Sequence, residues 1–110
     1  MTGRRPAGAL ALGLLVVVVL VVAASSRADL TRDRIAWWRT IAQCETGGRW
    51  RGLGPIYQGG LGIYWATWDW WARELGLLAR YPDAGDAPEL VQIRVADYGY
   101  RIHRGYWGCM

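Results

Sequence analysis

Glu45 is the residue of this sequence whose surroundings best suit acid–base chemistry. It follows Cys44, one of only two cysteines, and it stands just ahead of the pair Gly47-Gly48 in the stretch IAQCETGGRW. Residues 29–46 have the pattern of a helix, which an aspartate can cap at its start and the glycine pair can end. Glu45 is therefore expected on the last turn of this helix.

The apolar residues of the same helix predict the direction of the Glu45 side chain. At about 100° per residue, Ile35, Trp38, Ile41 and Ala42 form one stripe, and Glu45 falls inside it. A carboxyl group against core side chains loses hydration, which favours its protonated form, the form that a general acid needs. The alternative is a glutamate that extends into solvent from a fraying helix end.

The segment after this helix is predicted to be a glycine-rich loop with a short hairpin. Residues 49–66 contain Pro55 and too many glycines for a helix. Within them, the part from Ile56 to Tyr64 predicts two short strands, with a glycine pair at the turn. Because only a short connection separates this hairpin from the end of the first helix, the hairpin is expected next to Glu45.

Two further helices are predicted in the second half of the chain. Thr67 has the properties of an N-cap for one of them, which is expected to end at Tyr81-Pro82. Pro88 is expected at the first position of the other, which Gly105 would stop. The apolar stripe of the last helix is predicted from Val91, Val95, Tyr98 and Ile102. The expected fold class is thus mainly α within the α+β class, with three helices around a short hairpin rich in glycine and tyrosine.

Residues 1–28 are predicted to direct the chain across a membrane. Arg4 and Arg5 precede an apolar run from Ala7 to Ala24, and small residues follow. This pattern indicates a secretory signal that is cleaved after residue 24 or 28. The alternative is an uncleaved membrane anchor, because the run of 18 residues reaches the length of about 17–25 that spans a bilayer. Both interpretations place residues 29–110 outside the cytoplasm, secreted or in the cell envelope.

Charge and metal-ligand content argue against two classes of function. From Asp29 onward, ten arginines stand against nine acidic residues, so the domain has no electrostatic footprint for nucleic acid. One histidine, His103, and two cysteines give no zinc-ligand spacing, and neither a metal nor a cofactor is expected. In an exported chain, Cys44 and Cys109 are candidates for a disulfide; the alternative is two reduced, buried thiols.

Aromatic residues are concentrated in the same part of the chain. All eight tryptophans and six tyrosines lie after residue 36, and there is no phenylalanine. Such side chains offer a flat apolar face and a polar group, which suits contact with sugar rings, so a carbohydrate groove is one interpretation. The other is that tryptophan fills the core of a small domain. With eight tryptophans in so short a chain, some are expected to be exposed.

Five motifs in order resemble a known family. They are IAQCETGGRW (41–50), YQGGL (57–61), ATW (66–68), VQIRVAD (91–97) and GYWGC (105–109). Together they cover essentially all of residues 29–110, and their order and spacing resemble the resuscitation-promoting factors. These are small secreted domains that cleave peptidoglycan and have a lysozyme-like fold. The C-E-[ST]-G-G element is the most specific of the matches.

The resemblance implies roles for particular residues. Glu45 corresponds to the family's catalytic acid, and Thr67 to the threonine that helps to hold the substrate. Cys44 and Cys109 correspond to the disulfide that ties the catalytic helix to the C-terminus. The positions that match the groove are Trp50, Tyr57, Gly59, Gly60 and Trp68. The implied partner is the peptidoglycan glycan strand.

The chain departs from the family pattern at three places. Gly62 stands where the family usually has glutamine, and Arg49 where it usually has asparagine. The family ending W-P-x-C is replaced by Tyr106-Trp107-Gly108-Cys109. These differences put substrate preference and efficiency in doubt more than the reaction class.

The reaction implied by the resemblance is cleavage between N-acetylmuramic acid and N-acetylglucosamine. Glycosidases usually need two carboxylates, and the sequence offers no convincing partner for Glu45. A single acid suits a lytic transglycosylase, in which the substrate's own 6-hydroxyl attacks; hydrolysis by water is the alternative. The rival interpretations are a non-catalytic peptidoglycan-binding module and a surface that docks a partner such as a cell-wall peptidase.

Overall fold

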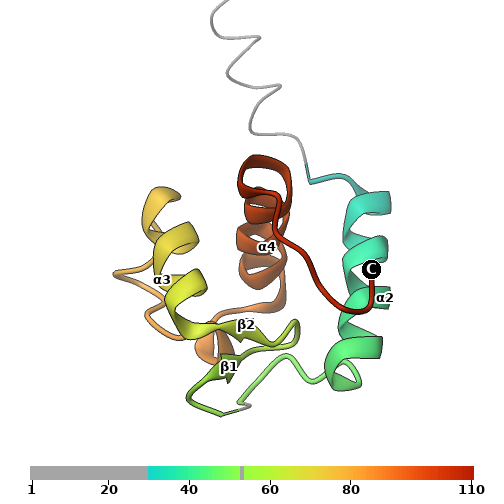
Figure 1. Cartoon of the computed structure of the whole chain (residues 1–110), viewed down its shortest axis with the longest axis horizontal. Coiled ribbons are helices and arrows are strands. Elements are labelled where there is room, and N and C mark those ends of the chain that lie inside the picture. Colours follow the sequence, from blue (N-terminus) through green and yellow to red (C-terminus); the bar gives the residue numbers. More distant parts are fainter. Residues whose placement is uncertain (1–29, 53) are drawn as a thin grey trace, which may run out of the picture. The chain divides into compact units, whose positions relative to one another are not determined.

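The computed structural model describes residues 30–52 and 54–110 (Figure 1). The described elements are α2 (Arg32–Thr46), β1 (Tyr57–Gln58), β2 (Ile63–Tyr64), α3 (Trp65–Glu74), the short 3₁₀ helix η1 (Ala84–Asp86) and α4 (Glu89–His103). The predicted combination of three helices with a small hairpin is confirmed. The predicted signal or anchor, residues 1–28, lies outside the described residues. No helix in the described part has both the length and the apolar character needed to cross a membrane.

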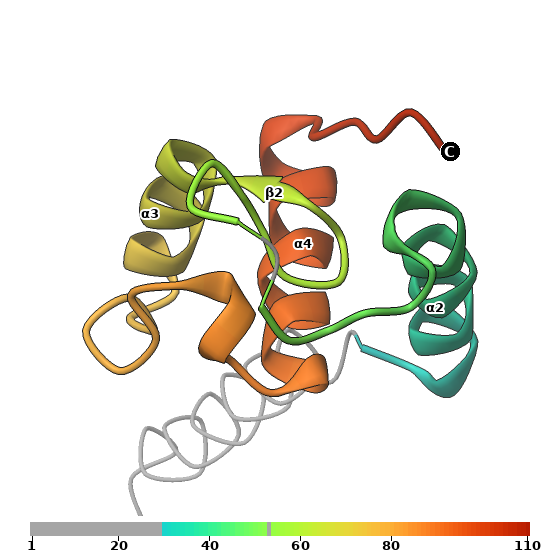
Figure 2. The same cartoon turned by 90° about the horizontal axis from the view of Figure 1, so that it is seen from below.

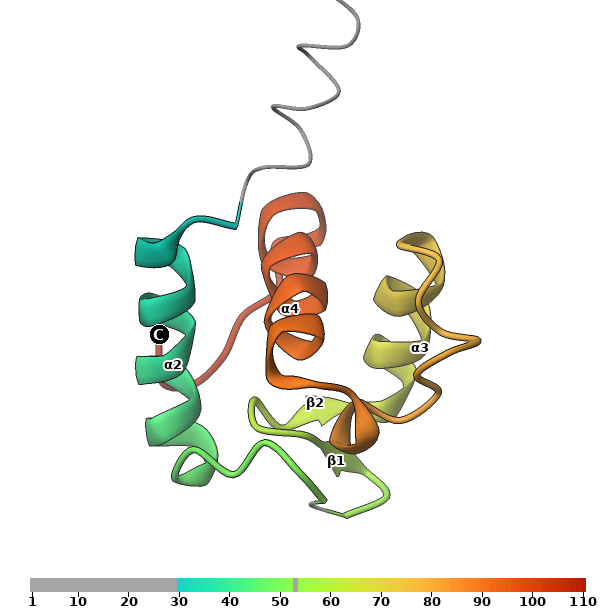
Figure 3. The same cartoon turned by 180° about the vertical axis from the view of Figure 1, so that it is seen from behind.

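Helix α4 is the centre of the domain. In Figures 1 and 3, α2 and α3 lie on its two sides, and both helices contact it. The antiparallel hairpin of β1 and β2 crosses one end of the three helices, and the view in Figure 2 shows it beside that end of α4. After α4, the C-terminal segment runs across to α2 (Figure 1), where Cys109 is bonded to Cys44.

Four tryptophans are the largest side chains of the core. Trp38 and Trp68 are fully buried, and Trp71 and Trp107 are 6% and 7% exposed. The Trp107 ring lies 4.8 Å from the Trp38 ring and 5.9 Å from the Trp71 ring, measured between centroids. Its indole N–H donates to the carbonyl of Leu61 at 2.9 Å. The C-terminal segment is therefore held in place by one ring that joins α2, α3 and the hairpin.

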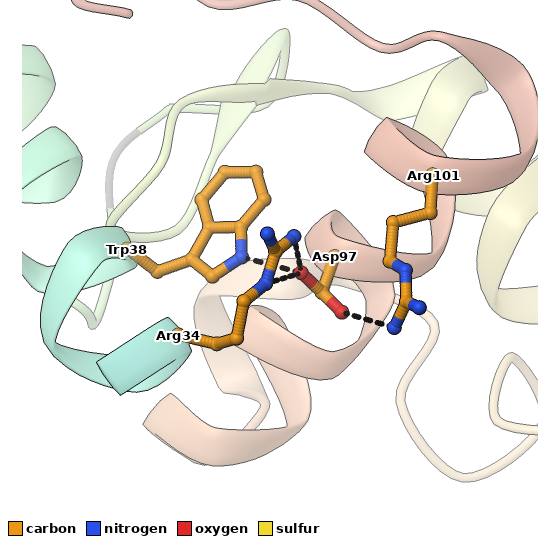
Figure 4. A network of polar contacts seen from close by, with 4 residues as sticks. All are labelled: Arg34, Trp38, Asp97 and Arg101. Atoms are coloured by element: carbon orange, nitrogen blue, oxygen red, sulfur yellow. Dashed lines mark hydrogen bonds and ion pairs between the residues drawn. The ribbon is translucent and has the colours of Figure 1, made fainter. Parts of the chain in front are cut away.

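A buried carboxylate ties α2 to α4 (Figure 4). Asp97 on α4 is 5% exposed, and its Oδ1 accepts hydrogen bonds from Trp38 Nε1 and Arg34 Nε, both at 3.0 Å. Arg34 Nη2 also reaches Oδ1, and Arg101 Nη1 lies 3.7 Å from Oδ2. Buried charges need such partners, because an unpaired carboxylate loses its hydration without compensation.

Helix α3 differs from the prediction at both ends. It begins at Trp65, with Tyr64 as N-cap, so the prediction that Thr67 caps it is wrong. The Trp65 N–H already donates to Ile56 O at 2.9 Å, and the chain passes from β2 into the helix without a loop. The helix ends at Glu74 rather than at Tyr81. Gly76 has a φ of +71° and closes the helix end, where the Leu77 N–H donates to Ala72 O at 2.8 Å.

Helix α4 begins and ends close to the predicted positions, but its buried face differs. Pro88 is its N-cap rather than its first residue, and Arg104, with a φ of +56°, follows its last turn. Ile102, predicted in the apolar stripe, is 61% exposed. Of the predicted stripe Val95 is buried, together with Gln92, Ile93, Ala96, Asp97 and Gly99. Because α4 packs between two helices, its buried arc is wider than an apolar stripe and includes polar residues that find partners inside.

Candidate functional site

Glu45 lies on the last turn of α2, which is the position that the following glycine pair predicted. Gly47 and Gly48 have φ values of +73° and +76°, which glycine adopts without the steric cost that other residues meet. Their N–H groups donate to Gln43 O at 3.0 Å and Ala42 O at 3.1 Å, which ends the helix. Glu45, in the turn just before them, is half-buried rather than fully extended into solvent.

The predicted disulfide is present and stands directly beside the acid. Cys44 and Cys109 are bonded, across a sequence separation of 65. The N–H of Cys109 donates to Glu45 Oε1 at 2.9 Å. One bridge and one hydrogen bond therefore fix the C-terminal segment against the last turn of α2. The hydrogen bond also fixes the direction of the carboxyl group, and it leaves Oε2 without a protein partner in the described part of the chain.

Two hollows meet at Glu45. The larger, of about 580 Å³, is lined by Glu45, Thr46, Gly54, Pro55, Ile56, Tyr57 and Gly62. The smaller, of about 250 Å³, is lined by Glu45, Tyr57, Gly62, Ile63, Tyr64, Thr67, Trp71, Tyr106, Trp107 and Gly108. Glu45, Tyr57 and Gly62 belong to both. The two hollows are therefore treated together as the Glu45 cleft, with the carboxyl group at the place where they join.

Three of the predicted site residues gather in this cleft. Glu45 and Thr67 line the smaller hollow together, and Tyr57 lines both hollows. Gly62, the main departure from the family pattern, also lines both, with a φ of +58°. A Cβ at this position would meet only Thr46 Cγ2, at 3.9 Å. The cleft floor beside Glu45 is thus open where a longer side chain would stand.

The other four predicted groove residues lie elsewhere. Trp68 is fully buried, its indole N–H donates to Tyr81 O at 2.8 Å, and it lines neither hollow. Gly59 and Gly60 are buried as well. A Cβ at Gly60 would lie 2.4 Å from the ring of Trp50, which therefore packs on the hairpin and not in the cleft.

Gln92 explains why the hairpin turn needs these glycines. Its Oε1 accepts the Gly60 N–H at 2.8 Å, and a Cβ at Gly59 would lie only 2.2 Å from that oxygen. Its Nε2 donates to Trp50 O at 2.7 Å and to Ala87 O at 2.8 Å. Gly59 thus allows a buried glutamine of α4 to approach the backbone, and Gly60 leaves room for the Trp50 ring. The resemblance had implied that both glycines line the groove.

Several cleft residues were not found from the sequence. Tyr64 sits directly opposite Tyr57 in the hairpin register, and the alternation of a predicted hairpin could have indicated it. Tyr106 and Gly108 come from the C-terminal segment, and no local pattern in the sequence places them near Glu45. Only the disulfide, by returning Cys109 to Cys44, gave an indirect signal of that neighbourhood.

The perturbed ionisable groups lie outside the cleft, between α3 and α4. Glu74 Oε1 lies 2.5 Å from His103 Nε2 and accepts the Tyr98 hydroxyl at 2.9 Å. These hydrogen bonds, that from His103 first, lower the pKa of Glu74. The same contact with Glu74 raises the pKa of Tyr98. None of the three residues lines either hollow, so this cluster joins two helices and takes no part in the cleft.

The chemical groups of the cleft are few. Glu45 is the one carboxylate among the described residues that line it, and the described residues contain no cluster of three metal-binding side chains. The remaining lining is aromatic, aliphatic or glycine, with the hydroxyls of threonine and tyrosine.

Comparisons with protein-family models, with curated proteins and with solved structures found no match for this chain.

Proposed function

We propose that residues 29–110 form a lysozyme-like domain that cleaves peptidoglycan glycan strands between N-acetylmuramic acid and N-acetylglucosamine, with Glu45 as general acid. The observation that carries the proposal is the position of Glu45, whose carboxyl group stands where two hollows of one cleft meet. A bond that is to be cleaved must have sugar on both sides of the acid. The resemblance of the five motifs to the resuscitation-promoting factors supports the same conclusion.

In the first step, Glu45 protonates the glycosidic oxygen. Because Oε1 accepts the Cys109 N–H, the acid proton belongs on Oε2, which is the oxygen left for the substrate. The bond between C1 and the glycosidic oxygen breaks as that oxygen gains the proton, and positive charge develops on the sugar ring. The negative charge that remains on Glu45 then stabilises this oxocarbenium-like ring.

In the second step, a hydroxyl replaces the leaving group. The described lining of the cleft offers no second carboxylate to act as nucleophile or base. We therefore assign the attack on C1 to the 6-hydroxyl of the same sugar, whose proton returns to Glu45. The products are a 1,6-anhydro-muramic end and a new N-acetylglucosamine end. Thr67, which lines the smaller hollow with Glu45, is placed to hold a substrate hydroxyl.

Digestion of purified peptidoglycan, with mass analysis of the fragments, tests this proposal. The oxidised protein is expected to release anhydro-muramic ends, and Glu45→Gln should lower the rate about 10²–10⁴-fold, the usual contribution of a general acid. Asp69→Asn is the matched control, because Asp69 is an acidic residue of α3 that lines neither hollow. Its rate should stay close to that of the unchanged protein.

Other products would change the assignment. Reducing ends instead of anhydro ends would make water the attacking group and the protein a muramidase. If neither the protein nor Glu45→Gln released fragments, and both still bound the cell wall, the domain would be a binding module. Loss of activity in Asp69→Asn alone would identify a second carboxylate in the mechanism.

A further inference from the structure

The outer face of the hairpin presents two tyrosines side by side. Tyr57 and Tyr64 are paired across the antiparallel strands, and their ring centroids lie 5.9 Å apart. They are 62% and 43% exposed, whereas their neighbours Gln58 and Ile63 point into the protein and are buried. The strand alternation therefore sorts these residues, with the polar and aliphatic pair inside and the aromatic pair outside.

Trp65 extends this pair into a row of three rings. Its centroid lies 5.7 Å from that of Tyr64, and the residue is 45% exposed. The Trp65 N–H donates to Ile56 O, at the start of the hairpin, at 2.9 Å. The backbone under all three rings is thus fixed by strand pairing and by this hydrogen bond. A preformed row of this kind loses little conformational freedom when a ligand covers it.

This aromatic row, Tyr57-Tyr64-Trp65, is continuous with the Glu45 cleft. Tyr57 lines both hollows and Tyr64 lines the smaller one, whereas Trp65 lines neither and stands beyond Tyr64. The Trp65 side chain makes no hydrogen bond within the described residues, although an indole N–H usually finds a partner when it is buried. The row leads from the acid out of the cleft and ends on an open indole.

We propose that Trp65, with Tyr64, forms an additional carbohydrate subsite at the outer edge of the cleft, which takes a sugar ring of an extended glycan strand. This inference rests on the proposed function, because the ligand proposed for the row is the same glycan strand that the cleft would bind. The apolar face of a sugar ring fits a flat aromatic ring, and its hydroxyls suit the phenol and indole polar groups. The row carries no charged side chain, which suits the uncharged sugar rings of a strand better than a charged peptide.

The test measures glycan binding as a function of strand length in the Glu45→Gln protein, where cleavage does not interfere. Calorimetry of the oxidised full chain is done with the peptidoglycan disaccharide and with longer glycan oligosaccharides. We expect affinity to rise with length. Trp65→Ala should lower the affinity for long strands by about two- to tenfold, which is the contribution of one aromatic contact. Affinity for the disaccharide should not change.

Two further variants make the result specific. Trp65→Tyr keeps an aromatic ring and should restore most of the gain. Trp70→Ala removes a ring on the same helix with a similar exposure, 48%, but Trp70 faces His103 and Glu74 and not the cleft. It should bind long strands like the parent.

The outcomes separate this inference from the proposed function. If Trp65→Ala bound long strands as tightly as the parent, the outer subsite would be refuted while the cleft proposal stood. An equal loss for the disaccharide and for long strands would also refute it, because that pattern indicates damage to the cleft. If the parent bound no glycan of any length, both proposals would fall, and the row would then have to serve a protein partner.

Discussion

Tryptophan and tyrosine occur in two regions of this domain with opposite environments. Between α2, α3 and the C-terminal segment, Trp38, Trp71 and Trp107 are packed on one another and almost fully buried. On the hairpin, Tyr64 and Trp65 stand in a row that solvent reaches. The two regions contain the same residue types, so composition alone cannot tell them apart.

The difference lies in what covers the rings. In the core, Trp38 and Trp107 each donate their indole N–H to a protein acceptor, the buried indole N–H of Trp71 has no acceptor among the described residues, and all three rings pack against other aromatic rings. In the row, Tyr64 and Trp65 are 43% and 45% exposed, and the indole N–H of Trp65 has no acceptor within the described residues. Core aromatics are thus committed to folding, whereas those of the hairpin are free to meet a ligand. Changes in the core should affect stability, and changes in the row should affect binding.

The largest effect is expected for Trp38→Ala. Removal of a fully buried indole leaves a cavity and deprives Asp97 of a donor, so the free energy of unfolding should fall by about 3–5 kcal/mol. Trp65→Ala should change it by less than about 0.5 kcal/mol, as is usual for surface substitutions. Urea unfolding of both oxidised variants measures this. Equal losses would mean that the row also supports the fold, and the contrast between the regions would disappear.

A smaller effect is expected where α4 meets the core. A Cβ on Gly99 would lie 2.1 Å from Trp71 Cε3, so Gly99→Ala should overpack the interface and cost about 1–3 kcal/mol. The gain in helix propensity, about 1 kcal/mol for Gly to Ala, works in the opposite direction. A double-mutant cycle with Trp71→Leu checks the cause, because the smaller side chain should relieve much of the cost. Additive losses would place the strain elsewhere.

The smallest effect is expected from the exposed cluster around Glu74. Hydrogen bonds from His103 and Tyr98 lower its pKa below the ordinary value of 4.5. Its contribution to stability is therefore complete above pH 4.5 and is lost as the pH falls through the lower, folded-state value. Glu74→Gln should flatten the acid side of a stability–pH profile. An unchanged profile would show that the cluster adds nothing to the link between α3 and α4.

At the other end of the pH scale, the same contact acts through Tyr98. The Glu74 carboxylate raises the pKa of the phenol above 10.0. The stabilisation is thus present below pH 10 and is lost as the pH rises through the folded-state value. In Tyr98→Phe this loss of stability at alkaline pH should be absent. Spectroscopic titration of the phenol and unfolding measurements at matched pH test this.

Glycine and proline correctly predicted the end of α2 and the start of α4, but not the end of α3. The glycine pair ended α2, and Pro88 stood at the start of α4, within one residue of the prediction. The start of α3 was misplaced because the helix follows β2 directly, where the Trp65 N–H donates to Ile56 O, just before β1. Its end was misplaced because Gly76, with a φ of +71°, ends the helix well before Tyr81-Pro82.

By itself, the sequence indicated three helices, a glycine-turned hairpin, a candidate disulfide between the two cysteines and the place of Glu45 on an apolar face. These follow from periodicity, from glycine conformation and from cysteine number, which are properties of neighbouring residues. Only the tertiary structure decided which aromatic rings are buried, because burial depends on contacts between distant segments. Trp107 meets Leu61 O, and Gln92 meets the hairpin turn. In the same way, Trp68 is buried and donates its indole N–H to Tyr81 O, whereas Trp65, in the same helix, is 45% exposed.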